Sequence, residues 1–188
     1  MDYSSIIVQL FKGLWFLPVL AIGVAVLSSP WLKGMVGEFL VNLTIRLRLS
    51  KHDYRLCKDV TLPTEDGTTQ IDHIIVSIYG IFVVETKNMR GWIFGSANQK
   101  MWTQKIYKHT HKFQNPLHQN YKHTKTLESI LELPSESIRS VIVFAGDSTF
   151  KTQMPPNVTD AGSFIRHIKS FNSPVLTPAQ VDRVWKQI

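Results

Sequence analysis

The chain has 188 residues, of which 44% are hydrophobic, and it carries a net charge of +7 with a pI of about 9.6. This length gives room for one domain of ordinary size with a short appendage. The excess of positive charge predicts an anionic partner, either nucleic acid or the anionic face of a membrane. The single cysteine, Cys57, excludes an intrachain disulfide and suits a reducing compartment.

The N-terminal part of the chain differs in composition from the rest, because residues 14–32 contain no charged residue. An apolar stretch of about 20 residues is long enough to cross a bilayer as a helix. The sequence therefore predicts a membrane anchor over residues 1–32 and a second domain over residues 33–188. A buried core helix and a cleaved signal peptide are the alternatives.

Basic residues are more frequent after this apolar span than before it: Lys33, Arg46, Arg48 and Lys51 follow it, and Lys12 precedes it. By the positive-inside rule, this asymmetry predicts a single-pass protein whose large domain lies in the cytoplasm.

The rest of the chain alternates between helical and strand patterns. In chain order, we expect a helix over 33–50, a strand over 56–63, a turn over 64–69, a hairpin over 70–88, strands over 91–96 and 100–107, a helix over 115–133, a strand over 140–146, and helices over 161–171 and from 177 onward. Asn115 is a suitable N-cap for the helix that follows it, and Pro134 ends that helix. This order predicts an α/β fold.

The hairpin over residues 70–88 carries three charged residues in strands that are otherwise apolar: Asp72, Glu85 and Lys87. If Tyr79 and Gly80 form a two-residue loop, Asp72 lies opposite Lys87, and all three charged side chains emerge on one face of the sheet. Their Cβ atoms should then lie within roughly 5–8 Å of one another. A change of one residue in loop length would move Asp72 to the other face.

Two carboxylates at this spacing repel each other unless positive charge lies between them. Lys87 compensates one charge, and a hard divalent cation such as Mg²⁺ would compensate the rest. Such a cation polarises phosphate and lowers the pKa of bound water. The alternative is a surface salt bridge at the end of a strand, which the apolar neighbours disfavour.

An Asp followed about a dozen residues later by Glu-x-Lys resembles the core of the PD-(D/E)xK nuclease superfamily. Further motifs resemble the nuclease-related domain called NERD in their order along residues 37–120: VGEF, QIDHIIV, GIFVVETKN, GWIFG, WTQ and FQNPLHQN. The resemblance implies a restriction-endonuclease-like α/β fold, with a mixed sheet flanked by helices, and nuclease activity.

The resemblance also implies roles for individual residues. Asp72 and Glu85 match the metal-binding carboxylates and Lys87 matches the catalytic lysine, while Glu38 matches a first-helix glutamate that assists the metal or its waters. The implied cofactor is Mg²⁺, with Mn²⁺ as a second candidate. For Glu38 the alternative is an ordinary glutamate on a helix surface.

Three polar residues further along match motif positions that would contact substrate or order the site: Gln104, Asn115 and Gln119. Asn115 and Gln119 lie at i and i+4 and therefore share a helix face. The alternatives are a satisfied sheet glutamine for Gln104 and a simple helix cap for Asn115.

Residues 105–125 combine five lysines, four histidines and interleaved aromatic residues. We expect this segment to form a basic surface that contacts phosphates, with Lys108 and Lys112 binding the substrate. Zinc binding by His109 and His111 is the alternative, but their spacing fits no zinc pattern.

Together these patterns predict a membrane-anchored, Mg²⁺-dependent nuclease that hydrolyses phosphodiester bonds, with DNA placed ahead of RNA as the substrate. One alternative is a nucleic-acid-binding domain that keeps the fold without turnover. Another is a membrane-bound scaffold whose basic surface binds anionic lipid.

Overall fold

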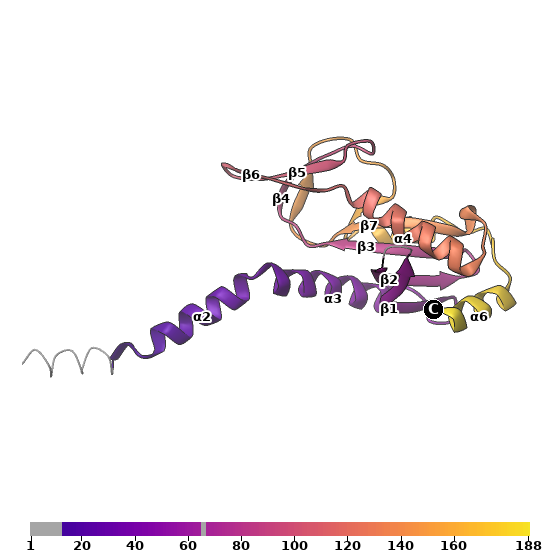
Figure 1. The fold of residues 1–188 in the computed structure, drawn as a ribbon, viewed down its shortest axis with the longest axis horizontal. Coiled ribbons are helices and arrows are strands. Elements are labelled where there is room, and N and C mark those ends of the chain that lie inside the picture. Colours follow the sequence, from indigo (N-terminus) through magenta and orange to yellow (C-terminus); the bar gives the residue numbers. More distant parts are fainter. Residues whose placement is uncertain (1–12, 65–66) are drawn as a thin grey trace, which may run out of the picture. The chain divides into compact units, whose positions relative to one another are not determined.

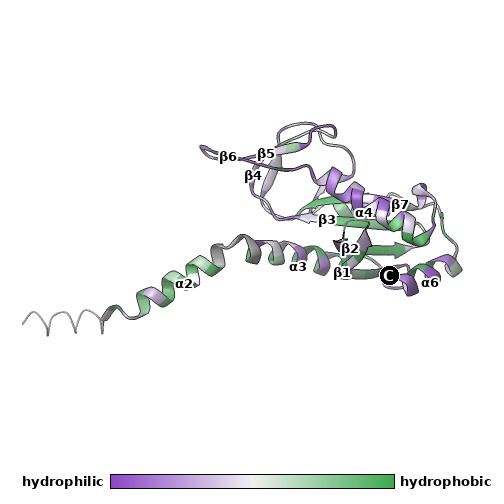
Figure 2. Cartoon of the chain, viewed as in Figure 1, coloured by the Kyte–Doolittle hydropathy of each residue, from purple (hydrophilic) through white to green (hydrophobic). Residues whose placement is uncertain are grey.

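A computed structural model describes residues 13–64 and 67–188 (Figure 1). The chain divides into two compact units between Val36 and Gly37. In the N-terminal part, α2 (Phe16–Ser28) is apolar along its length (Figure 2). The next helix is α3 (Pro30–Arg48). Between them, Ser29 has an extended backbone with ψ of 141°, as expected for a residue that precedes proline.

The break at Ser29 splits the apolar span that was expected to form one transmembrane helix over residues 14–32. Within residues 13–64 and 67–188, no helix combines the length and the apolar character needed to cross a membrane. The predicted membrane anchor is therefore not supported. The physical reason lies in Pro30, which disfavours the helical conformation of the residue before it.

The main sheet has five strands in the spatial order β1-β2-β3-β7-β9. These strands are β1 (Tyr54–Thr64), β2 (Gly67–Ser77), β3 (Gly80–Lys87), β7 (Ile138–Phe144) and β9 (Val158–Asp160). The first three are antiparallel, and β7 and β9 join them in parallel. The central strands β2, β3 and β7 are largely buried, as expected for strands covered on both faces.

Helices cover both faces of this sheet. On one face, α4 (Pro116–Leu131) and α6 (Pro178–Gln187) pack against side chains that include Ile74 and Val83. On the other face, α3 and α5 (Phe164–Lys169) pack against Ile75 and Phe82. A short 3₁₀ helix, Ser135–Ser137, connects α4 to β7.

A second, smaller sheet has the order β6-β5-β4-β8. It is formed by β4 (Gly91–Phe94), β5 (Met101–Ile106), β6 (His109–Gln114) and β8 (Ser148–Phe150). Its buried Trp102 stacks on Phe144 of the main sheet, with ring centroids 6.3 Å apart and planes 7° apart. The strands expected at 91–96 and 100–107 are confirmed. The pattern gave no sign of β6, because nearly all of its side chains are polar and exposed.

The β2–β3 hairpin differs in register from the expectation. Ser77 pairs with Gly80 and His73 with Val84, so the two-residue loop is Ile78–Tyr79. Gly80 belongs to the strand and has φ of 130°, a value that favours glycine. The predicted pairing was therefore wrong by two residues, but a shift of two preserves which side chains share a face. The structure is a mixed α/β fold with two mixed sheets flanked by helices.

Candidate active site

Asp72 and Glu85 come from the neighbouring strands β2 and β3, where the backbone pairing stops. The last pair is His73 with Val84, so Asp72 and Glu85 are the next two residues in the same register. In place of a ladder bond, the backbone N–H of Thr86 donates to Asp72 Oδ2 at 2.8 Å. The register therefore brings the two carboxylates together, rather than Asp72 and Lys87 as expected.

Lys87 lies between a strand residue and a helix residue. Its Nζ donates to Glu85 Oε1 at 2.7 Å and to Gln119 Oε1 of α4 at 2.9 Å. Glu85 is 3% exposed, whereas the Lys87 side chain keeps 23% of its surface exposed. The ammonium group is thus held at the edge of the carboxylate pair, with part of its surface accessible from solvent.

His123 is a member of this cluster that the sequence analysis placed on a basic surface. It is 4% exposed, and its Nε2 approaches Glu85 Oε2 to 3.4 Å. These two atoms are not aligned for a hydrogen bond. On its other side, His123 Nδ1 lies 3.0 Å from Thr69 Oγ1. Its position four residues after Gln119 was the available signal, because residues at i and i+4 share a helix face.

Asn120 fixes the helix that carries Gln119 and His123. Its buried side chain donates from Nδ2 to the carbonyl of Val83 at 2.9 Å and to Ser140 Oγ at 2.9 Å. These contacts join α4 to β3 and β7. Because a buried amide that is hydrogen-bonded specifies one packing arrangement, Asn120 sets how α4 lies over Glu85.

The two carboxylates have opposite pKa shifts. Burial raises the pKa of Asp72 to about 7, and the negative charges of Glu85 and Glu38 add to this effect. Burial also acts to raise the pKa of Glu85, but His123 and Lys87 outweigh it, so the pKa of Glu85 is lowered. Glu85 is thus favoured in its ionised form, whereas ionisation of Asp72 is unfavourable unless positive charge is added to the cluster.

Glu38, the matched residue of α3, lies near the two carboxylates. Burial first, and then the charges of Asp59 and Glu85, raise its pKa. The preceding Gly37 explains how the helix comes this close, because a Cβ there would lie 2.6 Å from Asn88 Cβ. Asp59 is a further acidic neighbour that the sequence did not indicate; it has φ of 53° within β1.

The remaining matched residues have structural contacts. Gln104 Nε2 donates to the carbonyl of Arg90 at 2.8 Å. Asn115 is fully buried: its Oδ1 accepts from Leu117 N at 2.9 Å, and its Nδ2 donates to carbonyls of the β4–β5 loop, the shortest being Gln99 at 2.7 Å. Asn115 is thus the helix cap that was expected as the alternative, and it also ties down the loop.

The donor set at Asp72 and Glu85 fits a hard cation. Glu85 Oε2 is buried without a hydrogen-bond partner in the described part of the chain, and Asp72 is destabilised when ionised. Magnesium prefers oxygen ligands and commonly takes only one or two carboxylates, with water and phosphate completing its shell. No group of three or more acidic, histidine or cysteine residues suited to a metal occurs within 13–64 and 67–188.

The basic segment divides between the second sheet and the helix α4. Lys108 lies in the turn between β5 and β6 and Lys112 on β6, both exposed, whereas Lys122 and Lys125 are on α4. On the second sheet, Trp92 belongs to this basic surface although no sequence pattern indicated it. It is 47% exposed, and the Nζ atoms of Lys105 and Lys151 lie 6.0 and 4.8 Å from its ring centroid.

A family model of the nuclease-related domain matches residues 33–145, more than half of the 188 residues. The chain belongs to the nuclease-related domain (NERD) family. The matched range contains the whole carboxylate cluster, Gln119 and His123. This membership is consistent with the PD-(D/E)xK superfamily.

A relative of this NERD chain is an uncharacterized protein of Bacillus anthracis, 49% identical over 104 residues. The aligned part covers 55% of this chain and 49% of that protein. The chain therefore spans about half the length of the curated relative that it matches.

Proposed function

We propose that this NERD domain is a metal-dependent nuclease that hydrolyses phosphodiester bonds, with DNA as the first substrate to test and RNA as the second. The observation that carries the proposal is the pairing of Asp72 with Glu85 at the point where the strands separate, with Lys87 held beside them. Family membership supports a nuclease-related function.

In this proposal Asp72 and Glu85 hold Mg²⁺, or Mn²⁺ in its place, and the cation would polarise the phosphate and supply a water of lowered pKa. The residues of the chain prepare the site. The Thr86 N–H orients Asp72, and His123 and Lys87 keep Glu85 ionised. Each of these contacts fixes a carboxylate before substrate arrives, which is what efficient electrostatic catalysis needs.

Lys87 is proposed to stabilise negative charge that develops on the phosphate. Gln119 and Glu85 accept from its Nζ, so the ammonium is positioned rather than free to rotate. A fixed positive charge at a partly buried site stabilises a transition state more than the same charge in water does. Glu38 is proposed to orient water near the pair, since burial, and after it the charges of Asp59 and Glu85, raise the pKa of its carboxyl group.

The substrate backbone is proposed to follow the second sheet. Lys108 and Lys112 are exposed there, and Trp92 with its two flanking lysines offers an aromatic surface beside positive charge. Aromatic side chains among lysines are typical of surfaces that bind nucleic acid. The arrangement also suits the alternative function, a nucleic-acid-binding domain without turnover.

The test is cleavage of linear and circular DNA, and of RNA, by the full chain with and without Mg²⁺. Wild type is expected to cut one of these substrates only when metal is present, and Lys87→Ala to lose turnover by orders of magnitude while still binding DNA. Lys125→Ala is the matched control, because this lysine contacts Glu128 on an exposed helix face.

The outcomes separate the two candidate functions. Metal-dependent cleavage that Lys87→Ala removes and Lys125→Ala does not would support the nuclease. Salt-sensitive DNA binding without cleavage under any metal would favour the binding domain. Equal cleavage by wild type and Lys87→Ala would exclude the proposed site.

A cytoplasmic location of the NERD domain stays a prediction. It suits the presence of nucleic acid and keeps Cys57, a free thiol, reduced. Fractionation of cells that produce the full chain, followed by protease treatment before and after lysis, tests it. Digestion in intact cells would contradict this location.

A further inference from the structure

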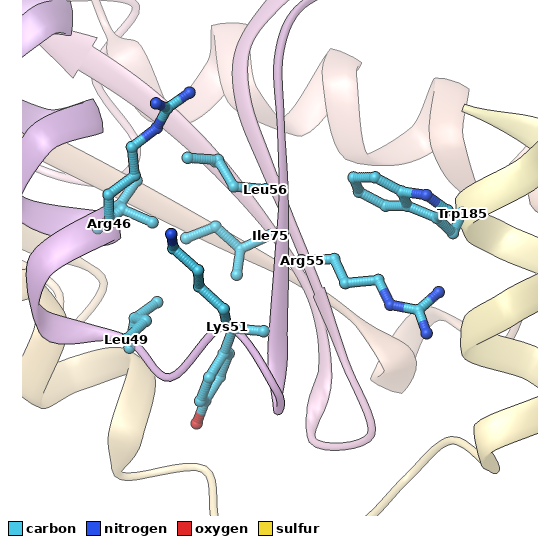
Figure 3. A pocket seen from close by; sticks show the side chains of 9 residues that line it. Arg46, Leu49, Lys51, Arg55, Leu56, Ile75 and Trp185 are labelled. Atoms are coloured by element: carbon cyan, nitrogen blue, oxygen red, sulfur yellow. The ribbon is translucent and has the colours of Figure 1, made fainter.

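A pocket of about 300 Å³ lies between the end of α3, the start of β1 and the helix α6 (Figure 3). Its lining includes Arg46, Leu49, Lys51, Leu56, Ile75 and Trp185. A volume near 300 Å³ is at the small end of ligand pockets, which suits a compact molecule rather than a polymer.

One wall of the pocket is cationic. Arg46 and Lys51 are exposed, and neither has an ion-pair partner among the described residues. In Figure 3 both side chains lie on the α3 side of the pocket. No acidic residue belongs to the lining, so the two charges are available for an anion.

The floor is apolar, and the opposite wall combines the Trp185 indole with Arg55. Ile75 is fully buried beneath the pocket and Leu49 is 6% exposed. The indole of Trp185 extends from α6 toward Leu56 (Figure 3) and is 38% exposed. Arg55 stabilises this wall, because its guanidinium lies 5.9 Å from the Trp185 ring centroid and pairs with Asp182 at 2.7 Å.

The pocket is separate from the carboxylate cluster. Asp72, Glu85 and Lys87 do not belong to its lining, and Glu85 lies instead beside His123 of α4. Ile75 packs with Val41 and Ile45 of α3, in a core cluster distinct from the one under α4. A ligand here would not occupy the proposed catalytic site.

The partial negative charge at the end of α3 accounts for Arg46 but not for Lys51. Basic residues in the last turn of a helix offset its partial negative charge, and Arg46 and Arg48 of α3 do so. Lys51 lies beyond the end of the helix, yet it also lines the pocket. Two cations facing an exposed indole across an apolar floor match a ligand with a flat ring at one end and an anion at the other.

We propose that this pocket binds a mononucleotide, with its base against Trp185 and Leu56 and its phosphate between Arg46 and Lys51. Purine and pyrimidine bases stack on indole rings, and a phosphate takes charge-assisted hydrogen bonds from guanidinium and ammonium groups. The site gives the domain a means of sensing free nucleotide at the β1 edge of the main sheet, through residues that are not part of the carboxylate cluster.

The experiment is calorimetric titration of the full chain, in EDTA so that metal does not recruit ligand to Asp72 and Glu85. The probes are deoxyadenosine monophosphate, deoxyadenosine, inorganic phosphate and dioctanoyl phosphatidic acid. The monophosphate is expected to bind more tightly than the other three. Lys51→Ala and Trp185→Ala should each weaken it by about tenfold or more.

Trp15→Ala is the matched control, since Trp15 is an exposed indole in the N-terminal unit, outside the pocket and the second sheet. It should leave the affinity for the monophosphate unchanged, and circular dichroism checks that each variant is folded. Equal binding of phosphate and monophosphate would reduce the site to a bare anion site. Tighter binding of the phosphatidic acid would assign it to lipid. No binding, or an equal loss of affinity with Trp15→Ala, would overturn the proposal.

Discussion

Replacement of Asp72 by Asn should stabilise the protein at neutral and alkaline pH. The pKa of Asp72 is about 7 in the folded protein against the ordinary 3.8, so the folded state binds this proton more tightly than the unfolded chain. The proton on Asp72 therefore contributes fully to the free energy of unfolding below about pH 4, and this contribution is lost as the pH rises through 7. At 1.36 kcal/mol for each pH unit, the whole loss is about 4 kcal/mol.

Asn is isosteric and uncharged, and its Oδ1 still accepts from the Thr86 N–H, so the variant escapes this loss. The stability of Asp72→Asn relative to wild type should rise by about 2 to 3 kcal/mol between about pH 5 and about pH 8. The assay is urea unfolding of both proteins at a series of pH values, followed by circular dichroism.

Magnesium should reverse this difference. If the pair holds the cation, Mg²⁺ at about 100 times its dissociation constant stabilises wild type by about 2.7 kcal/mol and the variant by less. Asp147→Asn, which changes an exposed carboxylate, is the control and should show neither effect. A stability difference between Asp72→Asn and wild type that does not change from pH 5 to pH 8 would refute the assigned electrostatics.

Three further substitutions test other parts of the structure. Glu85→Gln should abolish cleavage and weaken Mg²⁺ stabilisation, because it removes the ionised member of the pair while leaving a group that Lys87 can still contact; activity and thermal shift with metal measure this. Asn115→Ala should lower the free energy of unfolding by about 2 to 4 kcal/mol, since it removes a helix cap and leaves buried carbonyls unpaired. Gly95→Ala should cost about 1 to 3 kcal/mol, because its Cβ would lie 2.3 Å from the Trp102 ring.

Two control substitutions accompany the predictions for Asn115→Ala and Gly95→Ala. Thr177→Ala removes the exposed N-cap of α6 and should cost only about 1 kcal/mol, so an equal loss at Asn115 would show that its loop contacts are unimportant. Gly13→Ala adds a Cβ that meets nothing, and should leave stability unchanged. Full cleavage by Glu85→Gln would remove that residue from the proposed site.

The sequence by itself determined the order of the main elements and placed Asp72, Glu85 and Lys87 in one hairpin. Apolar alternation marked β2 and β3, and the face shared by Asp72, Glu85 and Lys87 follows from the two-residue period of a strand. Asn115 and Pro116 marked the start of α4, because cap chemistry acts within a few residues. Local rules of this kind can be applied without knowing the rest of the fold.

Only the tertiary structure decided which of these groups meet. The hairpin loop is Ile78–Tyr79, and a register error of two leaves the apolar pattern intact, so sequence could not show that Asp72 lies beside Glu85 rather than Lys87. The contacts of Gln119 with Lys87 and of His123 with Glu85 span 32 and 38 residues along the chain. They depend on how α4 crosses the sheet, which is set by the packing of many buried side chains together rather than by any local pattern.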